Sequence, residues 1–245
     1  MDRQTATRSL IVILPLALAA GAASAQQKVL FSDNFESDTV KPQWTWVHLS
    51  ERSPFTQFSG RYSYNTIKLN LDAPKPPPGN SGNDGGGSGD GSGGGSGDGG
   101  GSGGGGINAI RYTLSFDFYA IDSWDGNDTR YGPDRFEISN GKKKLFSETF
   151  GNVWGQQTFR EPDVGRFNMA YGSAADAIYR NITVQFDQPL GEAVRLSFYD
   201  LGLQGLSDES WGIDNVQVRY EFVPTPATLP MIAGGGLLAL RRRRR

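Results

Sequence analysis

A two-residue alternation runs through residues 112–120 of this chain. Tyr112, Leu114, Phe116, Phe118 and Ala120 alternate with Thr113, Ser115, Asp117 and Tyr119. Because successive side chains of a β-strand point to opposite faces, this stretch predicts a strand with one face in a core. Shorter alternations occur at residues 67–71, 136–138, 182–186, 194–198 and 216–222.

Turn-forming groups separate these predicted strands. They include Asp125-Gly126-Asn127, Gly132-Pro133-Asp134 and Asn140-Gly141. Between the two ends of the chain, no segment shows ten or more residues of helical periodicity. The pattern predicts an all-β fold, an antiparallel β-sandwich of the jelly-roll type. The chain has no cysteine, so its core must be stable without disulfides.

A glycine-rich tract interrupts the predicted sandwich at residues 79–106. It contains 18 Gly, five Ser, three Asp, two Asn and no apolar side chain. Such a segment has nothing to bury, so it predicts a disordered insertion. If the strands at residues 66–71 and 111–120 are neighbours, the tract lengthens the tip of a hairpin. The alternative is a calcium-binding nonapeptide array, but the tract lacks the large aliphatic residue that each repeat requires.

Residues 1–25 have the three parts of a secretory signal peptide. Arg3 and Arg8 are positive, residues 10–20 are apolar, and Ala23-Ser24-Ala25 supplies the small residues that signal peptidase needs. A transmembrane helix is the alternative, but the apolar run is short for one. The predicted domain, residues 26–222 without the tract at 79–106, is long enough for one sizeable core.

Residues 223–245 form another separate segment. It opens with a box made of Val223, Pro224, Thr225, Pro226 and Ala227. The prolines predict the end of the last strand, because proline cannot donate to a sheet. Residues 227–240, apolar except for one threonine, predict a short hydrophobic helix, and the five arginines at 241–245 would stay cytoplasmic and halt export. The alternative is a buried C-terminal helix with a solvated basic end.

This order of box, apolar helix and arginine cluster resembles a PEP-CTERM sorting signal of the VPLPA type, with Thr225 in place of the leucine of that type. The resemblance implies a Gram-negative bacterium in which an exosortase cuts near the box. It also implies export through signal peptidase, transient insertion in the inner membrane, and delivery to the cell envelope or extracellular matrix.

Five blocks in the middle of the chain carry a second resemblance. They are residues 58–62, 114–118, 122–127, 132–134 and 205–216. These blocks are similar to a secreted jelly-roll domain of bacterial surface proteins and, more loosely, to MAM and other lectin-like sandwiches. The resemblance implies a fold and a location, and no particular chemistry.

The charge of the exported part differs from that of the whole chain. Without residues 1–25 and 241–245, 17 Lys and Arg face 25 Asp and Glu, a net charge of −8. An acidic domain is a poor partner for nucleic acid or anionic lipid and suits divalent cations. We therefore expect no nucleic acid as a partner.

The first candidate cation site is a run of acids after the strand at residues 112–120. Asp122, Asp125, Asp128 and Asp134 lie within 13 residues around a sharp turn. Their oxygens suit the six to eight ligands that Ca²⁺ prefers, although the spacing is not that of an EF-hand. The alternative is a solvated turn whose Asp and Asn side chains bond to their own backbone.

The second candidate site joins the first predicted strand to the last. Asp33 and Glu36 lie on the former, Asp214 and Asn215 on the latter. The resemblance to MAM-like domains implies a structural Ca²⁺ between these strands. The alternative is that Asp214, which alternates with Ile213, simply faces solvent.

The five tryptophans are candidates for polysaccharide binding or for the core. Trp124 lies between Ser123 and Asp125 in a predicted loop, so we expect it to face solvent and to bind a sugar ligand. Trp211, next to Gly212, is expected in the core. Trp44, Trp46 and Trp154 are expected there too, because buried tryptophan is the commoner case.

The sequence offers little for catalysis. His48 is the single histidine, no Gly-x-Ser-x-Gly elbow occurs, and zinc ligands are lacking. We therefore expect a non-catalytic surface or matrix protein that binds calcium and polysaccharide. The alternatives are a glycan hydrolase using Glu137 and Glu148 as an acid pair, and a purely structural matrix component.

Overall fold

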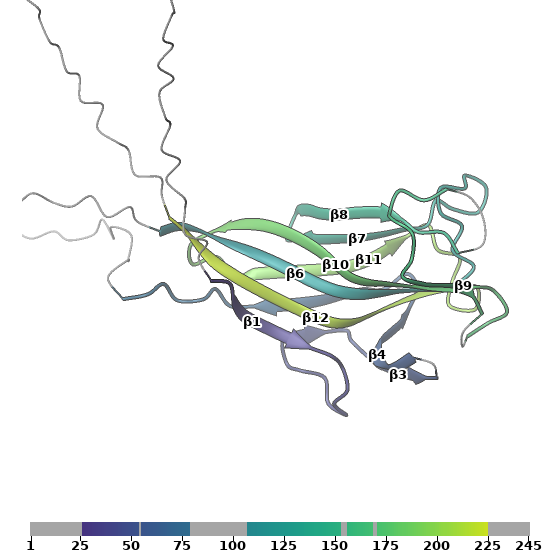
Figure 1. Ribbon diagram of the computed structural model, residues 1–245, viewed down its shortest axis with the longest axis horizontal. Helices are drawn as coiled ribbons and strands as arrows, with labels where there is room; N and C mark the ends of the chain where they lie inside the picture. The colour runs from purple at the N-terminus through teal and green to yellow at the C-terminus, as the bar shows by residue number, and fades with distance from the viewer. Residues whose placement is uncertain (1–25, 54, 79–106, 153–155, 169–170, 225–245) are drawn as a thin grey trace, which may run out of the picture.

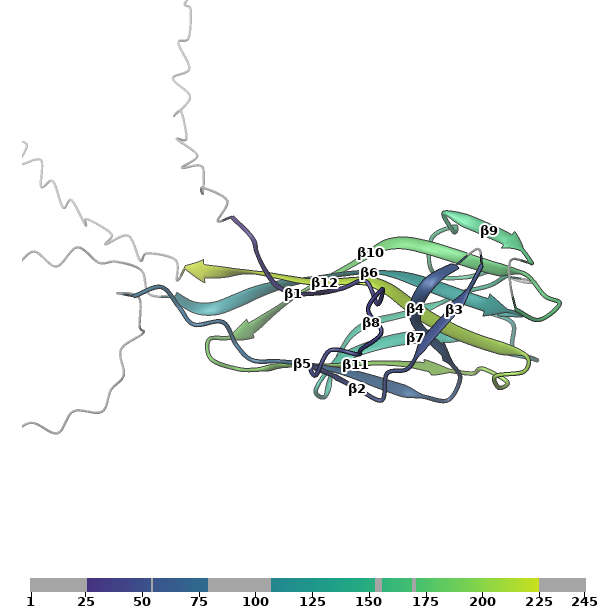
Figure 2. The ribbon, with the colours of Figure 1, turned by 90° about the horizontal axis from the view of Figure 1, so that it is seen from below.

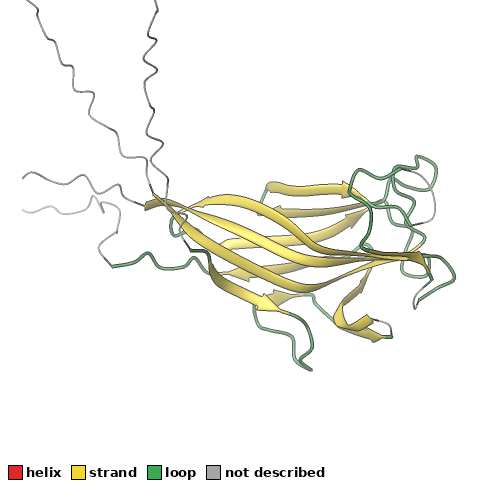
Figure 3. Cartoon of the chain, viewed as in Figure 1, coloured by secondary structure: helices red, strands yellow, loops and turns green. Residues whose placement is uncertain are grey.

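The computed structural model describes residues 26–53, 55–78, 107–152, 156–168 and 171–224 (Figure 1). These residues contain twelve β-strands and no helix (Figure 3). The strands are β1 (Lys28–Asp33), β2 (Trp44–Thr45), β3 (Leu49–Arg52), β4 (Phe55–Tyr62), β5 (Thr66–Leu71), β6 (Ile107–Asp122), β7 (Arg135–Asn140), β8 (Lys143–Thr149), β9 (Val164–Phe167), β10 (Asp176–Pro189), β11 (Val194–Leu201) and β12 (Glu209–Pro224). The all-β prediction is confirmed.

The strands form two antiparallel sheets. The larger has the order β3-β4-β12-β6-β10-β9, with β1 also paired to β12, and the smaller has the order β2-β5-β11-β7-β8. Figure 2 shows β10, β6 and β12 in one layer and β5, β11 and β2 in the other. The core lies between the two layers.

Strand β6 shows why the alternation was informative. Its alternating apolar residues, from Tyr112 to Ala120, are fully or almost fully buried between the sheets. Phe118 packs against Phe136 of the opposite sheet, with ring centroids 4.4 Å apart. The two-residue alternation in the sequence therefore predicted the buried face of this strand correctly.

The outer face of the large sheet is also covered near the end of β6. Phe55 and Phe58 of β4 pack there on Tyr119 and Ile121 of β6, and Tyr171 lies against them. With the core on the other side, β6 is therefore buried on both faces from Phe116 onward, and its burial no longer alternates from one residue to the next.

The predicted hairpin around the glycine-rich tract is wrong. Strand β5 pairs with β2 and β11 in the small sheet, whereas β6 pairs with β12 and β10 in the large one. The connection therefore crosses from one sheet to the other. Residues 79–106 themselves lie outside the described residues.

The sandwich has two different ends (Figure 1). Strand β6 begins and β12 ends at one of them, while the loops after β6 and before β12 lie at the other. Val223 and Pro224 still belong to β12, where Pro224 lies opposite Ile107 of β6, and Pro224 is the last residue that the structure describes. Thr225, Pro226 and Ala227, the predicted helix at 227–240, the arginines and the signal peptide at 1–25 lie outside the described residues. In the part of the chain that is described, no helix has the length and apolarity needed to cross a membrane.

Candidate functional site

Three buried carboxylates meet at the loop end of the sandwich. Strands β6 and β12 are paired so that Asp122, the last residue of β6, lies opposite Glu209, the first of β12. The loop after β6 carries Asp125 and Asp134 to the same place. One carboxylate oxygen from each of Asp125, Asp134 and Glu209 lies within 4.8 Å of the other two. We call these three residues the acidic triad.

Hydrogen bonds hold the triad in place. The backbone N–H of Asp125 donates to Oδ2 of Asp134, and the backbone N–H of Asp134 donates to the carbonyl of Gly126 at 2.9 Å. Oε2 of Glu209 accepts the backbone N–H of Gln204 at 2.7 Å. The carboxylates of Asp134 and Glu209 are thus each fixed by one backbone donor, whereas the carboxylate of Asp125 accepts the side-chain amide of Gln204.

The second oxygen of two triad members has no such partner. Asp134 and Glu209 are each 0% exposed, and Oδ1 of Asp134 and Oε1 of Glu209 are buried without a hydrogen bond. Burying a charged oxygen without a hydrogen bond or a counter-charge costs on the order of several kcal/mol, so carboxylates of this kind are normally protonated or bound to a metal. The two orphan oxygens are therefore the atoms that a shared proton or a bound cation would compensate.

The pKa values agree with this geometry. Burial, with a smaller contribution from the charge of Asp125, raises the pKa of Asp134 to about 6. Burial, followed by the charge of Asp134, raises the pKa of Glu209 to about 8. Burial, followed by the nearby charges of Asp128 and Asp208, also raises the pKa of Asp125. Without a bound cation, the site favours protonated acids.

Glycines leave space around the orphan oxygen of Asp134. A Cβ at Gly202, where φ is +97°, would overlap the carbonyl of Pro133 and lie 3.4 Å from Oδ1 of Asp134. A Cβ at Gly132 would lie 3.3 Å from the same oxygen. The backbone comes close to the triad only because these positions lack side chains.

The donor set fits a hard cation. The three carboxylates provide oxygen ligands only. Nε2 of Gln204 donates one hydrogen bond to Oδ2 of Asp125 at 3.5 Å and another to the carbonyl of Tyr131. Oxygen ligands of this kind suit Ca²⁺, whereas zinc prefers histidine or cysteine. Asp125, Asp134 and Glu209 would hold the ion.

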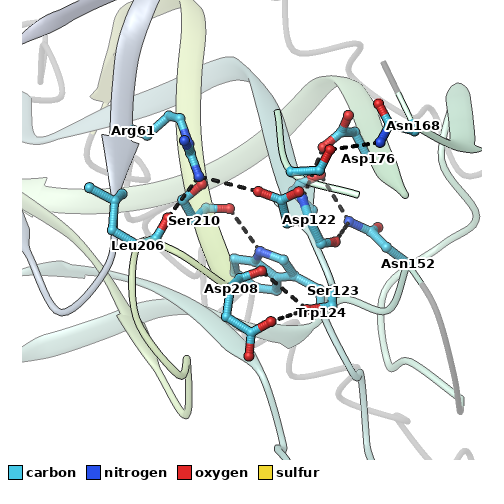
Figure 4. A network of polar contacts seen from close by, with 12 residues as sticks. Arg61, Asp122, Ser123, Trp124, Asn152, Asn168, Asp176, Leu206, Asp208 and Ser210 are labelled. Atoms are coloured by element: carbon cyan, nitrogen blue, oxygen red, sulfur yellow. Dashed lines mark hydrogen bonds and ion pairs between the residues drawn. The ribbon is translucent and has the colours of Figure 1, made fainter. Parts of the chain in front are cut away.

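The structure brings together only some of the acids predicted to cluster at residues 122–134. Asp125 and Asp134 come together, but Asp122 points elsewhere: its Oδ2 accepts Arg61 Nη2 at 3.2 Å (Figure 4). Burial, then the charge of Asp176, raises the pKa of Asp122 to about 6. Asp122 is therefore part of an ion-pair network and not of the triad.

Asp128 is a turn residue whose carboxylate bonds to nearby backbone, which was the alternative to a cation ligand. Its Oδ1 accepts the backbone N–H groups of Arg130 and Tyr131, which lowers the pKa of Asp128. Asp128 is a solvated turn acid.

The structure does not bring Asp33, Glu36 and Asp214 of the second predicted cation site together as one group of ligands. Oδ1 of Asp33 accepts the backbone N–H of Phe35 and Oδ2 accepts Nε1 of Trp44 at 2.9 Å, while Lys41 supplies a positive charge 3.7 Å away. Glu36 lies beyond the end of β1 and is exposed. Among the described residues, the acidic triad has carboxylate oxygens within 4.8 Å of one another, whereas Asp33, Glu36 and Asp214 do not form such a group.

Asp214 is buried, so the alternative reading of an outward-facing acid is also wrong. Its Oδ2 accepts the hydroxyl of Tyr119 at 3.0 Å and its Oδ1 accepts the backbone N–H of Asn215. Both oxygens are used within the sheet. Burial, together with the charges of Asp117 and Glu36, raises the pKa of Asp214 to about 6.

The expectation that Trp124 faces solvent is wrong. Trp124 is 0% exposed, its Nε1 donates to the carbonyl of Ser210 at 2.8 Å, and its ring packs on Phe118 and Phe150. The loop folds back over the end of the sheet and takes the indole with it. Trp211 and Trp44 are buried as expected, Trp154 lies outside the described residues, and Trp46 is exposed.

The imagined acid pair of a glycan hydrolase is not assembled. Glu137 lies opposite Ser147 and Glu148 lies opposite Phe136, so the two acids point to opposite faces of the sheet. Glu137 is further occupied by Lys144 at 2.6 Å, Ser147 and Tyr199.

Sequence reasoning missed Glu209 and Gln204. Glu209 is the first residue of β12 and Gln204 lies just before this strand, so both are far from Asp125 in the sequence. Only the pairing of these two strands brings them together. The block at residues 205–216 was noticed for its resemblance, but nothing local marks Glu209 as a ligand.

Searches for related proteins give no match: no family model, no curated protein and no solved structure is significantly similar to this chain.

Proposed function

We propose that this protein is an exported, non-catalytic surface or matrix protein of a Gram-negative bacterium, whose jelly-roll sandwich is stabilised by Ca²⁺ bound to the acidic triad. The observation that carries the calcium proposal is the pair of buried oxygens without partners, Oδ1 of Asp134 and Oε1 of Glu209. A divalent cation would compensate both charges at once.

The cation would act on folding. It would tie the loop after β6 to the start of β12 and would bind the folded state alone, because the unfolded chain does not assemble the triad. In this proposal, Ca²⁺ is structural and performs no chemistry.

Location is supported by the two ends of the sequence. Residues 1–25 have the order of a signal peptide and residues 223–245 that of a PEP-CTERM sorting signal. Signal peptidase and an exosortase would then be the partners during export. The acidic, cysteine-free sandwich would be the part that works in the envelope or matrix.

Thermal unfolding in EDTA and in millimolar Ca²⁺ tests the calcium proposal. A ligand at 100 times its Kd adds about 2.7 kcal/mol, which for a protein of this size raises Tm by about 5–10 °C. Glu209→Gln should remove this rise, while the exposed acid variant Asp128→Asn should keep it. An equal rise in wild type and Glu209→Gln would place the cation elsewhere and refute the site.

A further inference from the structure

Two aromatic side chains are unusually exposed. Among the large hydrophobic residues of the described ranges, Trp46 at 75% and Tyr64 at 70% have the highest exposed fractions. Most tryptophans and tyrosines of a soluble domain are at least half covered. Neither ring makes an aromatic contact within the part of the chain that is described.

Both residues also have an uncommon backbone conformation. The φ angle is 65° at Trp46 and 58° at Tyr64. Bulky side chains rarely adopt this left-handed region, and such strain persists only where the surrounding structure holds it. Glycine or asparagine would adopt this backbone conformation with less strain, so an aromatic residue at either position lowers the stability of the fold.

The core holds each backbone firmly. The N–H of Tyr64 donates to Oδ2 of Asp200 at 3.0 Å, and Oδ1 of the same carboxylate accepts Nε1 of buried Trp211 at 2.7 Å. On the other side, Val47 packs against the core, which turns Trp46 outward. The rings are therefore presented on fixed backbone.

One contact links the two segments. The N–H of His48 donates to the hydroxyl of Tyr62 at 3.0 Å, that hydroxyl donates to the carbonyl of His48, and the two rings lie 4.5 Å apart. Trp46 precedes this His48–Tyr62 contact by two residues and Tyr64 follows it by two. The exposed rings thus flank one rigid connection.

Strand pairing places the rings at the same corner of the sandwich. Strand β2 is the edge of the small sheet, and its Thr45 lies opposite Lys68 of β5 (Figure 2). Trp46 directly follows Thr45, the last residue of β2, and Tyr64 lies two residues before Thr66, where the antiparallel strand β5 begins. Trp46 and Tyr64 therefore border the same end of the β2–β5 pair.

The chemistry of this corner fits sugar rings. Flat aromatic faces stack on the apolar faces of pyranoses, and the exposed polar side chains of Thr45, His48 and Asn65 surround them. The exported domain has a net charge of −8, which disfavours an anionic polymer.

We propose that Trp46 and Tyr64 form a stacking surface for a neutral polysaccharide. This inference rests on the proposed function, because it names the matrix component that the exported sandwich would bind, and it moves the polysaccharide contact from Trp124 to a different corner. It assigns no role to calcium, because neither Trp46 nor Tyr64 belongs to the acidic triad.

Affinity electrophoresis of the full-length protein tests the proposal, with hydroxyethylcellulose as the neutral polymer and alginate as the anionic one. Wild type should be retarded by hydroxyethylcellulose and not by alginate. Trp46→Ala and Tyr64→Ala should each lose affinity by about tenfold or more, as expected for exposed aromatic anchors. Phe167→Ala is the matched control, since Phe167 is an exposed aromatic on β9 of the other sheet, and it should behave as wild type.

Trp46→Gly separates binding from folding. Glycine accepts the left-handed backbone, so this variant should keep or raise the thermal midpoint of wild type while losing retardation. No retardation of wild type, or equal retardation of wild type and Trp46→Ala, would overturn the proposal. So would a lower sedimentation coefficient for Trp46→Ala, because the rings would then cover a second copy of the chain.

These outcomes are distinct from failure of the proposed function. Retardation that depends on Trp46 in a protein found only in the cytosol would leave the stacking surface standing and refute the location.

Discussion

Asp134 lies in the loop after β6 and Glu209 begins β12, yet their buried carboxylates lie within coordinating distance of each other and each has one oxygen without a hydrogen bond. The sheet sets their separation, because Glu209 begins the strand that pairs with the end of β6. A cation bound here would tie the loop after β6 to the start of β12.

The glycine next to the triad offers a matched pair of variants. Gly202→Ala adds a Cβ that overlaps the carbonyl of Pro133 beside Asp134, at a φ of +97°. Gly191→Ala adds a Cβ at a φ of +83° with nothing within 4 Å. Gly191→Ala should cost about 1–2 kcal/mol from backbone strain alone. Gly202→Ala should cost more and should also weaken calcium binding, both measured by urea unfolding with and without Ca²⁺. Equal costs and an unchanged calcium response would show that the space beside Asp134 is unimportant.

Stability without calcium should depend on pH in a defined direction. Burial raises the pKa of Glu209 to about 8 and of Asp134 to about 6, above the values of about 4 that these groups have in an unfolded chain. The folded state therefore holds more protons over this interval, and the free energy of unfolding falls as pH rises from about 4 to about 8.

Urea unfolding in EDTA at about pH 5 and about pH 8 measures this effect. The midpoint should be lower at the higher pH, and Glu209→Gln or millimolar Ca²⁺ should each reduce the difference. Asp122 and Asp214, whose pKa values burial also raises to about 6, supply a calcium-independent remainder. A midpoint that rises between these pH values in EDTA would contradict the protonated triad.

Asp117 stabilises irregularities on both neighbours of β6. Its Oδ1 accepts the backbone N–H of Asn181, where β10 shifts register, and its Oδ2 accepts Nδ2 of Asn215, where β12 shifts register. Asp117→Ala leaves both donors without their partner and should cost about 2–4 kcal/mol. Asp187→Ala, which removes an exposed ion pair with Arg111, should cost less than about 1 kcal/mol. Equal costs in equilibrium unfolding would refute the role assigned to Asp117.

The end of β12 gives a clean place to test sorting. Deleting residues 225–245 leaves every described strand intact, because β12 ends at Pro224. The truncated protein should fold, export and accumulate in soluble periplasmic fractions, whereas the full chain should reach the surface or matrix. Replacing the five arginines at 241–245 with serine should give the same redistribution. Surface delivery of the truncated protein would contradict the sorting proposal.

Sequence reasoning succeeded where structure follows from neighbours along the chain. The alternation at residues 112–120 reports one strand and one buried face, and six such runs all lie in strands of the structure. These are local effects, so one sequence is enough to read them.

It failed where distant strands meet. The hairpin between β5 and β6 was wrong because their polar connection carries no information about which sheet each strand joins. Trp124 was assigned to solvent from its polar neighbours, whereas the loop folds back and places the ring on Phe118. Glu209 was overlooked because its partnership with Asp134 exists only through the pairing of β6 and β12.

Calorimetric titration of Ca²⁺ into the metal-free protein at neutral pH tests the calcium site most directly. We expect one ion per chain in wild type and in Asp214→Asn, no binding in Glu209→Gln or Asp134→Asn, and release of protons as the ion enters the triad. Binding of unchanged stoichiometry and affinity in Glu209→Gln, or no binding by wild type, would contradict a calcium ion held by Asp125, Asp134 and Glu209.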